Sequence, residues 1–567
     1  MKLQSAVATA SLLALASAQS KLQCPGTFNP ISAADFVKAL NPGWNLGNTL
    51  DAVPEEGRWN NPPVAPSTFD DIKASGFKSI RLPVTWTTKI GPPPTYTVNS
   101  TWLERVSTVL DQITSRGFYA IVNVHHDSLE WFDFTAPGAD VKAIEEKFYR
   151  LWYQIGEKLG CKSNLVAFEP INEPKGTTME HADVMNRMNA VFLKAINDAG
   201  GFNAQRVVTL VGLGEDSIKT SQWFKPPTGY SNPWALQYHY YSPYDFIFTA
   251  WGKTIWGSDD DKKSLETDLK LIRQNFTDIP LVIGEWAASP VATESAARWK
   301  YMDHFIRMAA KYNTATMLWD NGADFLDRAS HAWRDPVAER VIIKAAQGAV
   351  NSLPDSTEDA KATSQTSSAH VFHKVGEAVN TQTLPFKLNG NTVKGIQASP
   401  DSNLTSADYS VSGSNIVFTT AFLNRYINTT ATPGIKANLT ISFSQGASSQ
   451  IQLVQWDIPT LGGASTSKAE KGKDIRIPIT WKGIAKPAAV KAISSDGKYL
   501  ADDWTQYLGP LQQGYATYNN HWNWDAGNLI LTKGAVDTVA NAKKSTTFTF
   551  EFWPRVPGNS VKYTLTA

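Results

Sequence analysis

Up to about residue 353 the chain alternates short apolar segments with amphipathic helical segments, and this alternation constrains its fold more than any other feature. Segments that are apolar on both faces are typical of parallel strands covered by helices. Eight such segments occur: 43–48, 79–84, 119–126, 165–173, 206–212, 235–241, 280–286 and 314–322. Eight strand–helix units predict a (β/α)8 TIM barrel. The alternative is a doubly wound open sheet, but neither a GxGxxG nor a Walker loop follows the first segment.

The chain changes character after the region 19–353, which holds the predicted barrel. Residues 354–371 are rich in Ser, Thr, Ala and Asp and have no periodicity, which predicts a linker. Beyond them, strand-like segments alternate with Gly and Asn turns, and helical patterns nearly vanish. We therefore expect an α/β barrel followed by two all-β sandwich domains, at 372–447 and 448–567.

The N-terminus indicates export. Lys2, an apolar stretch and the small-residue pattern ASA at 16–18 resemble a secretory signal peptide spanning 1–18, with an ordinary N-terminal helix as the alternative. The two cysteines, Cys24 and Cys161, could form one bridge in an exported protein, but sequence alone does not give their distance. Five N-x-S/T sequons agree with export: Asn99, Asn275, Asn403, Asn428 and Asn438.

Charge and composition exclude two classes of partner. The formal net charge is +1 and no basic stripe occurs, so nucleic acid and anionic membranes are poor partners. No apolar run after the N-terminus is long enough to span a bilayer. Twenty tryptophans are unusual and suggest surfaces on which flat ligands stack. We expect a secreted, extracellular monomer.

Polar side chains gather where the apolar segments end. They are Asn45, Asn48, Arg81, His125, His126, Asn172, Glu173, His239, Tyr241, Glu285, Trp319 and Asp320. Active sites of (β/α)8 barrels lie at the carboxyl ends of the strands. This clustering therefore predicts a catalytic site.

Two of these residues, Glu173 and Glu285, can face each other across the barrel mouth. Opposed carboxylates suit glycosidic cleavage, because one protonates the leaving oxygen while the other, ionised, attacks the anomeric carbon. A less hydrated environment would raise the pKa of the acid. An adjacent cation would keep the pKa of the nucleophile low, and Arg81 is the candidate for this cation. The alternative is that both glutamates are structural members of ion pairs.

Other polar residues near these strand ends allow more than one role. The run from His125 to Asp127 suggests a metal site, but neighbouring residues of a strand point to opposite faces, so we expect no metal. Glu169 shares its parity with Glu173 and should point into the barrel below it, as a partner of Arg81 or a histidine. A purely structural acceptor is the alternative for Glu169. No cofactor is implied.

The segments GWNLGNTLD, RLPVTW, NVHHD, INEP, QYHYYSP, GEW and LWDNG, in this order within 43–322, resemble glycoside hydrolase family 5 in its cellulase-like branch. The resemblance implies that Glu173 is the acid/base and Glu285 the nucleophile. It also implies retention of anomeric configuration, with carboxyl groups about 5 Å apart. Arg81 and Tyr241 would donate hydrogen bonds to the nucleophile. The remaining substrate-binding residues implied are His125, Asn172, His239 and Trp319.

Tryptophans recur in the loops after the predicted strands. Sugar rings present flat C–H faces that pack on aromatic rings, so we expect at least two of these side chains to line a cleft for an extended polysaccharide. Ordinary packing is the alternative for each of them. They are Trp59, Trp86, Trp131, Trp223, Trp251 and Trp256.

The two C-terminal regions resemble accessory modules. LNGNT and DYSVSGSNIVFTTAFL, within 372–447, resemble the immunoglobulin-like X2-type modules of cellulases. LVQWDIPTL, IPITWKG, DGKYLADDWTQY and NWDAGNLILT, within 448–567, resemble carbohydrate-binding module family 46, which in relatives can fold back beside the catalytic cleft. Its candidate sugar platforms are Trp504, Tyr507, Trp522 and Trp524.

Together these observations predict a secreted, retaining endo-β-1,4-glucanase that acts on plant cell-wall β-glucan of the cellulose, mixed-linkage or xyloglucan type. The module order favours decorated or mixed-linkage chains. A β-mannanase with the same carboxylates is one alternative, and a non-catalytic wall-binding protein is another. The intact set of Arg81, Asn172, Glu173 and Glu285 argues against the non-catalytic alternative.

Overall fold

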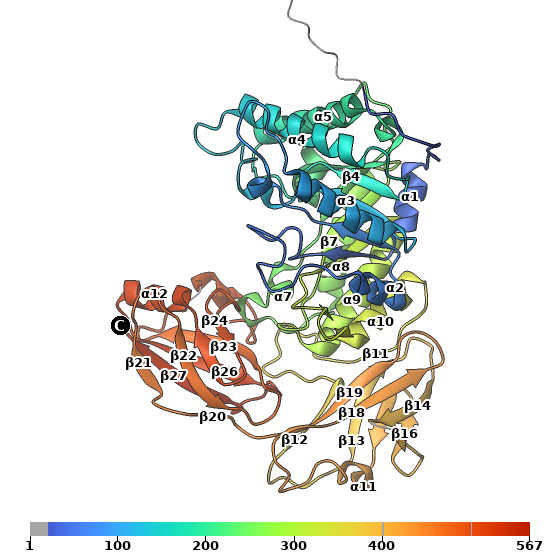
Figure 1. Cartoon of the computed structure of the whole chain (residues 1–567). Coiled ribbons are helices and arrows are strands. Elements are labelled where there is room, and N and C mark those ends of the chain that lie inside the picture. The colour runs from blue at the N-terminus through green and yellow to red at the C-terminus, as the bar shows by residue number, and fades with distance from the viewer. Residues whose placement is uncertain (1–20, 400–401, 501) are drawn as a thin grey trace, which may run out of the picture.

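The computed structural model describes residues 21–399, 402–500 and 502–567, so the expected signal peptide at 1–18 lies outside the described residues. Figure 1 shows three units in chain order: a barrel wrapped by helices and then two β-sandwiches. The barrel runs from blue to yellow-green, and the last sandwich is red.

The first unit is a closed barrel in which parallel strands β1 to β8 pair in sequence and β8 returns to β1. The strands are β1 (Gly43–Leu46), β2 (Ser79–Leu82), β3 (Tyr119–Asn123), β4 (Val166–Glu169), β5 (Val208–Asp216), β6 (Trp234–His239), β7 (Leu281–Trp286) and β8 (Thr314–Asp320). The helices are α1 (Ala33–Leu40), α2 (Pro66–Ser75), α3 (Ser100–Thr114), α4 (Val141–Leu159), α5 (Met179–Ala199), α6 (Ser217–Trp223), α7 (Tyr244–Ile247), α8 (Asp259–Asn275), α9 (Ser295–Lys311) and α10 (Pro336–Ala346). The predicted fold class is confirmed.

Most strands end earlier than the apolar pattern predicts. β3 ends at Asn123 and β4 at Glu169, so His125 and Glu173 lie in the loops that follow their strands. β4 stops where Pro170 follows, because proline has no N–H to donate to the ladder. The site residues therefore sit just above the barrel, on irregular backbone that can aim each side chain separately.

Local sequence explains how the helices begin and where they pack. Asn99 caps α3, Asp140 caps α4, and Ser258 starts α8 in a capping box. In α4, Trp152 packs on Phe168 of β4, with 5.7 Å between ring centroids. α4 thus buries an apolar face against the outside of the barrel.

The amino end of the barrel is closed by the first helix. Phe36, Val37 and Leu40 of α1 form a buried cluster with strand residues that include Ile121 and Val282. A disulfide joins Cys24 to Cys161, just past the end of α4. The N-terminal segment is therefore tied to the face opposite the strand ends that carry the polar residues.

The second unit is a sandwich of two sheets, with strand orders β11-β13-β17-β16 and β12-β19-β18-β14-β15. Its elements are β11 (Leu353–Pro354), β12 (His370–Lys374), β13 (Gln382–Lys387), β14 (Val393–Ala398), β15 (Ser402–Asn403), β16 (Tyr409–Ser412), β17 (Asn415–Phe418), α11 (Thr420–Leu423), β18 (Gly434–Phe443) and β19 (Ser449–Trp456).

The third unit pairs the sheets β20-β22-β25-β24 and β21-β27-β26-β23 around its own core. Its elements are β20 (Thr460–Leu461), β21 (Thr466–Lys468), β22 (Ile475–Thr480), β23 (Pro487–Ser494), β24 (Trp522–Trp524), β25 (Asn528–Leu531), α12 (Lys533–Ala542), β26 (Thr546–Phe552) and β27 (Ser560–Thr566). A small hairpin of β9 (Leu326–Asp327) and β10 (Ala332–Trp333) follows the barrel strand β8.

The predicted boundary between the two sandwiches, at 447/448, is corrected by the position of β19. This strand lies between β12 and β18 in the second unit, and its Ile451 and Leu453 are buried in that unit's core. The strand pattern of residues 448–456 does not by itself show which sandwich they join. The second unit therefore extends to Trp456.

The segment 354–371, expected to be a linker, makes specific contacts with the rest of the molecule. The N–H of Gln365 donates to the carbonyl of Arg555 in the third unit at 2.9 Å, and its Nε2 donates to the carbonyl of Thr254 in the barrel at 3.1 Å. The buried Arg555 donates in turn to the carbonyl of Gly252 at 2.8 Å. The segment thus helps to fasten the third unit against the barrel.

One observation, the surface position of most sequons, bears on the predicted export. Four of the five sequon asparagines are exposed and the fifth, Asn438, is half-buried. Among the described residues, no helix combines the length and apolar character needed to cross a membrane.

Candidate active site

A buried arginine organises the barrel mouth. Arg81, at the end of β2, is fully buried and donates to Glu169 through Nε at 2.7 Å and through Nη2 at 2.6 Å. Its Nη1 donates to Glu285 at 2.5 Å and its Nη2 to Asn172 at 2.8 Å. Its Nη1 also donates to Asn45 Oδ1 at 3.0 Å. One guanidinium therefore fixes residues from several strand ends, as an Arg with its planar array of donors can.

Glu169 is the partner of Arg81, as its parity in the strand predicts. Both side chains are fully buried, and Glu169 also accepts from Asn123 Nδ2 at 2.8 Å. Burial alone would raise the pKa of Glu169, but the charge and hydrogen bonds of Arg81 outweigh it and lower that pKa. Glu169 therefore stays ionised and balances the arginine below the reaction site.

Glu285 lies on β7 with both carboxylate oxygens held by donors. Arg81 binds Oε1, and the hydroxyl of Tyr241 donates to Oε2 at 3.0 Å. The Nε2 atom of His125 lies 4.0 Å from Oε1. The side chain is only 7% exposed, and burial raises the pKa of Glu285 above its ordinary value, although His239 and Arg81 oppose this.

Glu173 is held by its backbone rather than by a strand. Its φ of 41° lies in the left-handed region, which is unusual for a residue with a side chain. Its N–H donates to the carboxylate of Glu215, at the end of β5, at 2.8 Å. Its own carboxylate, 44% exposed, accepts from His239 Nδ1 at 2.7 Å. The loop thus lifts Glu173 into the open cleft.

The two candidate carboxylates lie close together around a histidine. One oxygen of Glu173, one of Glu285 and a ring nitrogen of His239 all lie within 4.8 Å of one another. The Nδ1 atom of His239 is 3.7 Å from Glu285 Oε2. A single sugar ring placed above them could contact both acids at once.

His239 is surrounded by carboxylates. Burial would lower its pKa, but Glu215, Glu285 and Glu173 raise the pKa of His239 to about 9. Its Nε2 lies 3.3 Å from the fully buried Glu215, and burial raises the pKa of Glu215 to about 8. At neutral pH the imidazole therefore carries a proton in contact with Glu173.

The pKa values of Glu173 and Glu285 shift in the opposite directions to those expected from the sequence. Burial by itself would raise the pKa of Glu173, but the hydrogen bond from His239 and the charges of His239 and Arg81 lower it. Glu285, expected to be the more acidic residue beside Arg81, has the raised pKa because it is nearly inaccessible to water. Strand order does not show how exposed each carboxylate is. The sequence therefore indicates the effect of Arg81 on the pKa of Glu285 but not the opposing effect of burial.

The other predicted substrate-binding residues surround the same point. Arg81 fixes the orientation of the Asn172 amide by donating to its Oδ1. The half-buried Trp319 stacks on His125, with ring centroids 5.7 Å apart and planes 8° from parallel. A side chain on Gly47 would approach the Trp319 indole to 2.8 Å, so glycine is required for the indole to lie there. All eight predicted residues therefore meet at one mouth.

The metal argument made from the sequence needs correction. His125 and His126 were expected to face opposite ways, yet their ring centroids are 4.5 Å apart, because both lie past the end of β3, where alternation no longer applies. Each offers a ligand atom within 4.8 Å of the other's and of a carboxylate oxygen of Asp51. Two backbone N–H groups, those of Asn48 and Thr49, already donate to this carboxylate.

The loop tryptophans divide into two groups. Trp86 and Trp256 are fully buried in the core and do not line the cleft. Trp131 and Trp223 are partly buried and pack against the same core. Trp59 is 40% exposed, and its ring lies 5.4 Å from that of His126 at the barrel mouth. Trp251 is half-buried and meets Trp504 of the third unit edge to face, with centroids 4.6 Å apart.

Two cavities flank the carboxylates. One of about 300 Å³ is lined by Glu173, Glu215 and His239. The other, of about 600 Å³, begins at Tyr241 and Trp319 and is closed on its far side by residues 517–520 of the third unit. The cleft is therefore built jointly by the barrel and the last unit.

The candidate platforms of the third unit have different surroundings. Tyr507 is 83% exposed and Trp504 is 39% exposed. Trp522 is 2% exposed and lies in the core of its own unit, with its Nε1 donating to the carbonyl of Ala516 at 3.2 Å, so it is not a platform. Trp524 is half-buried against that core.

Sequence reasoning missed Glu215, which aims the backbone of Glu173 and contacts His239. It lies at the end of the fifth predicted strand, in the run GLGED, and so obeys the same rule as the other site residues. The predicted strand ends at residue 212, before this acid, whereas β5 continues to Asp216. Extending each apolar segment to its next carboxylate would have found it.

Comparison with known proteins places these features in context. The sequence matches the family described as Cellulase (glycosyl hydrolase family 5) over residues 43–325 and the family Carbohydrate binding domain X2 over residues 365–453. It is 26% identical over 555 residues to Endoglucanase B of Paenibacillus lautus, covering 94% of this chain and 92% of that protein.

Solved structures extend the comparison to the whole chain. A tri-modular GH5 (subfamily 4) endo-beta-1,4-glucanase from Bacillus licheniformis, complexed with cellotetraose, is 35% identical with a TM-score of 0.84. The match covers 94% of this chain and 99% of that one. A GH5 xyloglucan-specific endo-beta-1,4-glucanase from a metagenomic library is 28% identical, with a TM-score of 0.51, and matches 55% of this chain and 98% of its own.

Proposed function

This chain belongs to glycosyl hydrolase family 5 and is a glycoside hydrolase, and from this premise we propose that it is an exported endo-β-1,4-glucanase that retains anomeric configuration. The observation that carries the proposal is the approach of Glu173 and Glu285, with carboxylate oxygens within 4.8 Å. Retaining glycosidases hold their two carboxyl groups about 5 Å apart, whereas inverting enzymes leave room for a water molecule between them.

In the first step Glu285 is the nucleophile. Its carboxylate attacks the anomeric carbon, the bond from that carbon to the glycosidic oxygen breaks, and the oxygen leaves with a proton from Glu173. Arg81 and Tyr241 hold both oxygens of Glu285, which fixes the line of attack. The raised pKa of Glu285 supports this role, because a poorly solvated carboxylate is the more reactive nucleophile.

The proton for the leaving group comes from the pair of His239 and Glu173. At neutral pH this pair holds one proton, on the histidine, across a contact of 2.7 Å. A glucan chain over Glu173 excludes water from its exposed carboxylate, and this desolvation raises its pKa. The shared proton then moves to Glu173 and on to the departing oxygen.

In the second step the same residues hydrolyse the glycosyl-enzyme. Glu173, now ionised, removes a proton from a water molecule, and the resulting oxygen attacks the anomeric carbon from the face that the leaving group vacated. The bond to Glu285 breaks and its carboxylate is restored. Two inversions give net retention.

Activity should fall on both sides of neutral pH. The pKa of His239 is raised to about 9, so the shared proton is present below that pH and is lost as pH rises through it. Glu285 must be ionised, and because its pKa is raised, the acid limb should lie above the usual carboxyl range near 4.3. The measurement is kcat/KM on a soluble β-glucan from pH 4 to 10, within the range where the enzyme stays folded.

A matched variant identifies the alkaline limb. His239→Gln removes the titrating group, so its residual activity should no longer fall near pH 9. The control is His331→Gln, which changes an exposed histidine bound to Asp71, away from the carboxylates. An unchanged alkaline limb in His239→Gln would show that another group supplies the proton.

The third unit supports a preference for soluble or decorated glucans. Aromatic rings form a path from the nucleophile to this unit, with centroids 6.0 Å apart between Tyr241 and Phe248. The path continues to Tyr244 at 5.0 Å and to Trp251 at 6.1 Å, and it ends at Trp504. We propose that residues 457–567 form a carbohydrate-binding module of family 46 that extends the cleft, and that xyloglucan or mixed-linkage glucan is the substrate.

Trp504→Ala tests this extension. The variant removes a half-exposed ring where the third unit meets the barrel. The value of kcat/KM on xyloglucan should therefore fall about tenfold, in keeping with the loss of one aromatic contact. Hydrolysis of an aryl β-cellobioside, which is too short to reach Trp504, should not change. The control is Val411→Ala on the second unit, an exposed apolar residue far from this path. Equal losses on both substrates would argue for a folding defect rather than a lost subsite.

Product analysis tests the activity itself and its alternatives. The enzyme should release short oligosaccharides from barley glucan, xyloglucan or soluble cellulose, with β configuration at the new reducing end when followed by proton NMR. Faster release from mannan would favour the β-mannanase alternative. Binding without any release would favour the non-catalytic one.

A further inference from the structure

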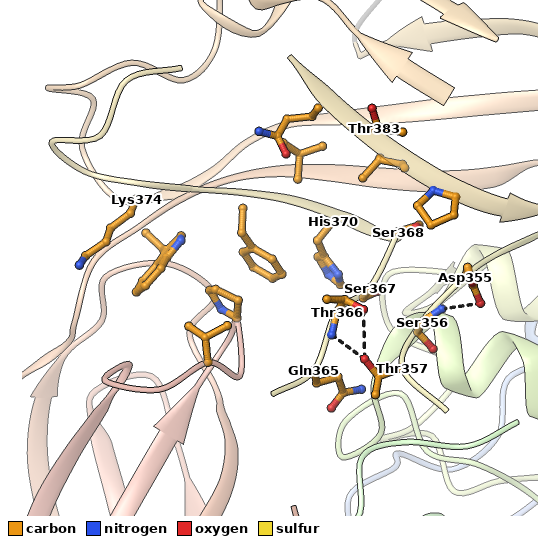
Figure 2. Close-up of a pocket in the computed structure, with 18 of the residues that line it drawn as sticks. Asp355, Ser356, Thr357, Gln365, Thr366, Ser367, Ser368, His370, Lys374 and Thr383 are labelled. Carbon is orange, nitrogen blue, oxygen red and sulfur yellow. Dashed lines mark hydrogen bonds between the residues drawn. The ribbon is translucent and has the colours of Figure 1, made fainter. Parts of the chain in front are cut away.

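One cavity of the molecule lies away from the catalytic cleft. It has a volume of about 660 Å³ and is enclosed by the segment 355–368, strands β12 and β13 of the second unit, and Pro554 and Val556 of the third unit. Figure 2 shows Thr366 and Ser356 of the segment on the side of the cavity near His370 of the second unit, with Thr383 farther away. Ligand pockets typically occupy roughly 300–1,000 Å³, so this volume is of the right size.

The cavity wall contains polar groups that lack a protein partner. Ser356 Oγ and His370 Nδ1 are buried, with residue exposures of 7% and 8%, and neither has a hydrogen-bond partner among the described residues. Buried polar atoms are rarely left in this state. Burial lowers the pKa of His370 to about 4, so its ring is neutral and can either donate or accept. Both residues belong to the cavity wall, and hydroxyl groups are the kind of partner that these atoms lack.

Aromatic and apolar surface completes the wall. Phe372 and Trp456 both line the cavity, and Phe372 stacks on His370 with ring centroids 5.0 Å apart. Thr383 is exposed at the rim. Aromatic rings together with scattered hydroxyl acceptors and donors suit a sugar, whose C–H faces are apolar and whose edges are polar.

Charge argues against an ionic ligand. The lining includes two acids, Asp355 and Glu377, and one lysine, Lys374, whose Nζ already lies over the Trp456 ring at 5.6 Å. An anion would meet both carboxylates, and a cation would meet only scattered side chains with no converging oxygen set. A neutral, hydroxylated ligand fits the wall best.

We propose that this cavity at the junction of the three units is a second binding site for β-glucan oligosaccharide, separate from the catalytic cleft. The choice of β-glucan as ligand rests on the proposed function. The site would hold a stretch of the polymer that is not being cut, and so keep the enzyme on its substrate between cleavage events.

The test is isothermal titration calorimetry with cellohexaose on the full chain carrying Glu285→Gln, which prevents turnover during the experiment. Two sites per chain are expected. Adding Thr383→Trp, which fills the exposed rim without removing a wall contact, should leave one site. Adding Phe372→Ala instead should weaken the second site about tenfold. The control is Thr440→Trp, an exposed threonine on β18 that does not line the cavity, which should keep two sites.

A single site in the Glu285→Gln protein would overturn the inference. Two sites that persist in Thr383→Trp would place the second one elsewhere and would overturn it equally. The proposed function fails on different evidence, because it requires the unmutated chain to hydrolyse a β-glucan. A protein that cuts β-glucan but binds cellohexaose once would lose only the junction site.

Discussion

Replacing Glu285 by glutamine should lower kcat on a β-glucan on the order of 10⁴-fold, because the amide cannot form the glycosyl-enzyme. The change preserves shape, and the single carbonyl oxygen of the amide can still accept from one of the two donors, Arg81 or Tyr241, while the other meets the NH2 group. Binding of cellotetraose at the cleft should therefore persist. The measurements are kcat on barley glucan and calorimetric affinity for cellotetraose. Full activity in this variant would remove the central claim about the nucleophile.

Azide separates the roles of the two glutamates. With an aryl β-cellobioside whose leaving group needs no proton, Glu173→Ala should still form the glycosyl-enzyme, and azide should release β-cellobiosyl azide in place of the hydrolysis product. In Glu285→Ala, azide fills the space of the lost carboxylate and attacks directly, so one inversion gives the α-azide. This test is decisive here because the pKa of Glu285 is raised and that of Glu173 lowered. Exchanged products would mean exchanged roles.

Replacing Arg81 by alanine should destabilise the fold by about 3–5 kcal/mol, the range seen when one partner of a buried ion pair is removed. Glu169 would remain fully buried without its cation, and Glu285 would lose a donor on Oε1. The folded fraction should also lose most of its turnover. The measurements are the free energy of unfolding in urea and kcat corrected for the folded fraction.

Arg206 supplies the matched control. It is also fully buried, but its guanidinium donates to backbone carbonyls, such as those of Ser163 and Val166 at 2.8 Å, away from the barrel mouth. Arg206→Ala should therefore cost stability while the folded fraction keeps its kcat. Full turnover of folded Arg81→Ala would show that this arginine serves the fold alone.

Much of the barrel could be read from the sequence because its signals are local. All eight predicted strands are present, since an apolar run between amphipathic helices is sufficient to mark a buried parallel strand. The ends were less accurate: β4 stops at Glu169, where Pro170 removes the ladder donor, and β5 runs on to Asp216. Glu215 was missed because β5 extends beyond its predicted end.

Packing decided the roles of the aromatic residues. Trp522 reads like an exposed platform in the run HWNWD, yet it fills the core of the third unit, whereas Trp504 remains at the surface. Trp86 and Trp59 differ in the same way within the barrel loops. The neighbouring sequence does not show whether a tryptophan is exposed, because its large ring can either fill a core or form a binding surface.

By itself, the sequence determined that seven of the eight strand ends would carry polar residues to one mouth, because barrel closure brings every strand end to the same face. It thereby identified Glu173, Glu285 and Arg81 as members of one site. Only the tertiary structure decided that Glu285 is shielded from water while Glu173 is exposed, and how residues 517–520 close the cleft. Desolvation and contacts between units depend on atoms distant along the chain, so no local pattern encodes them.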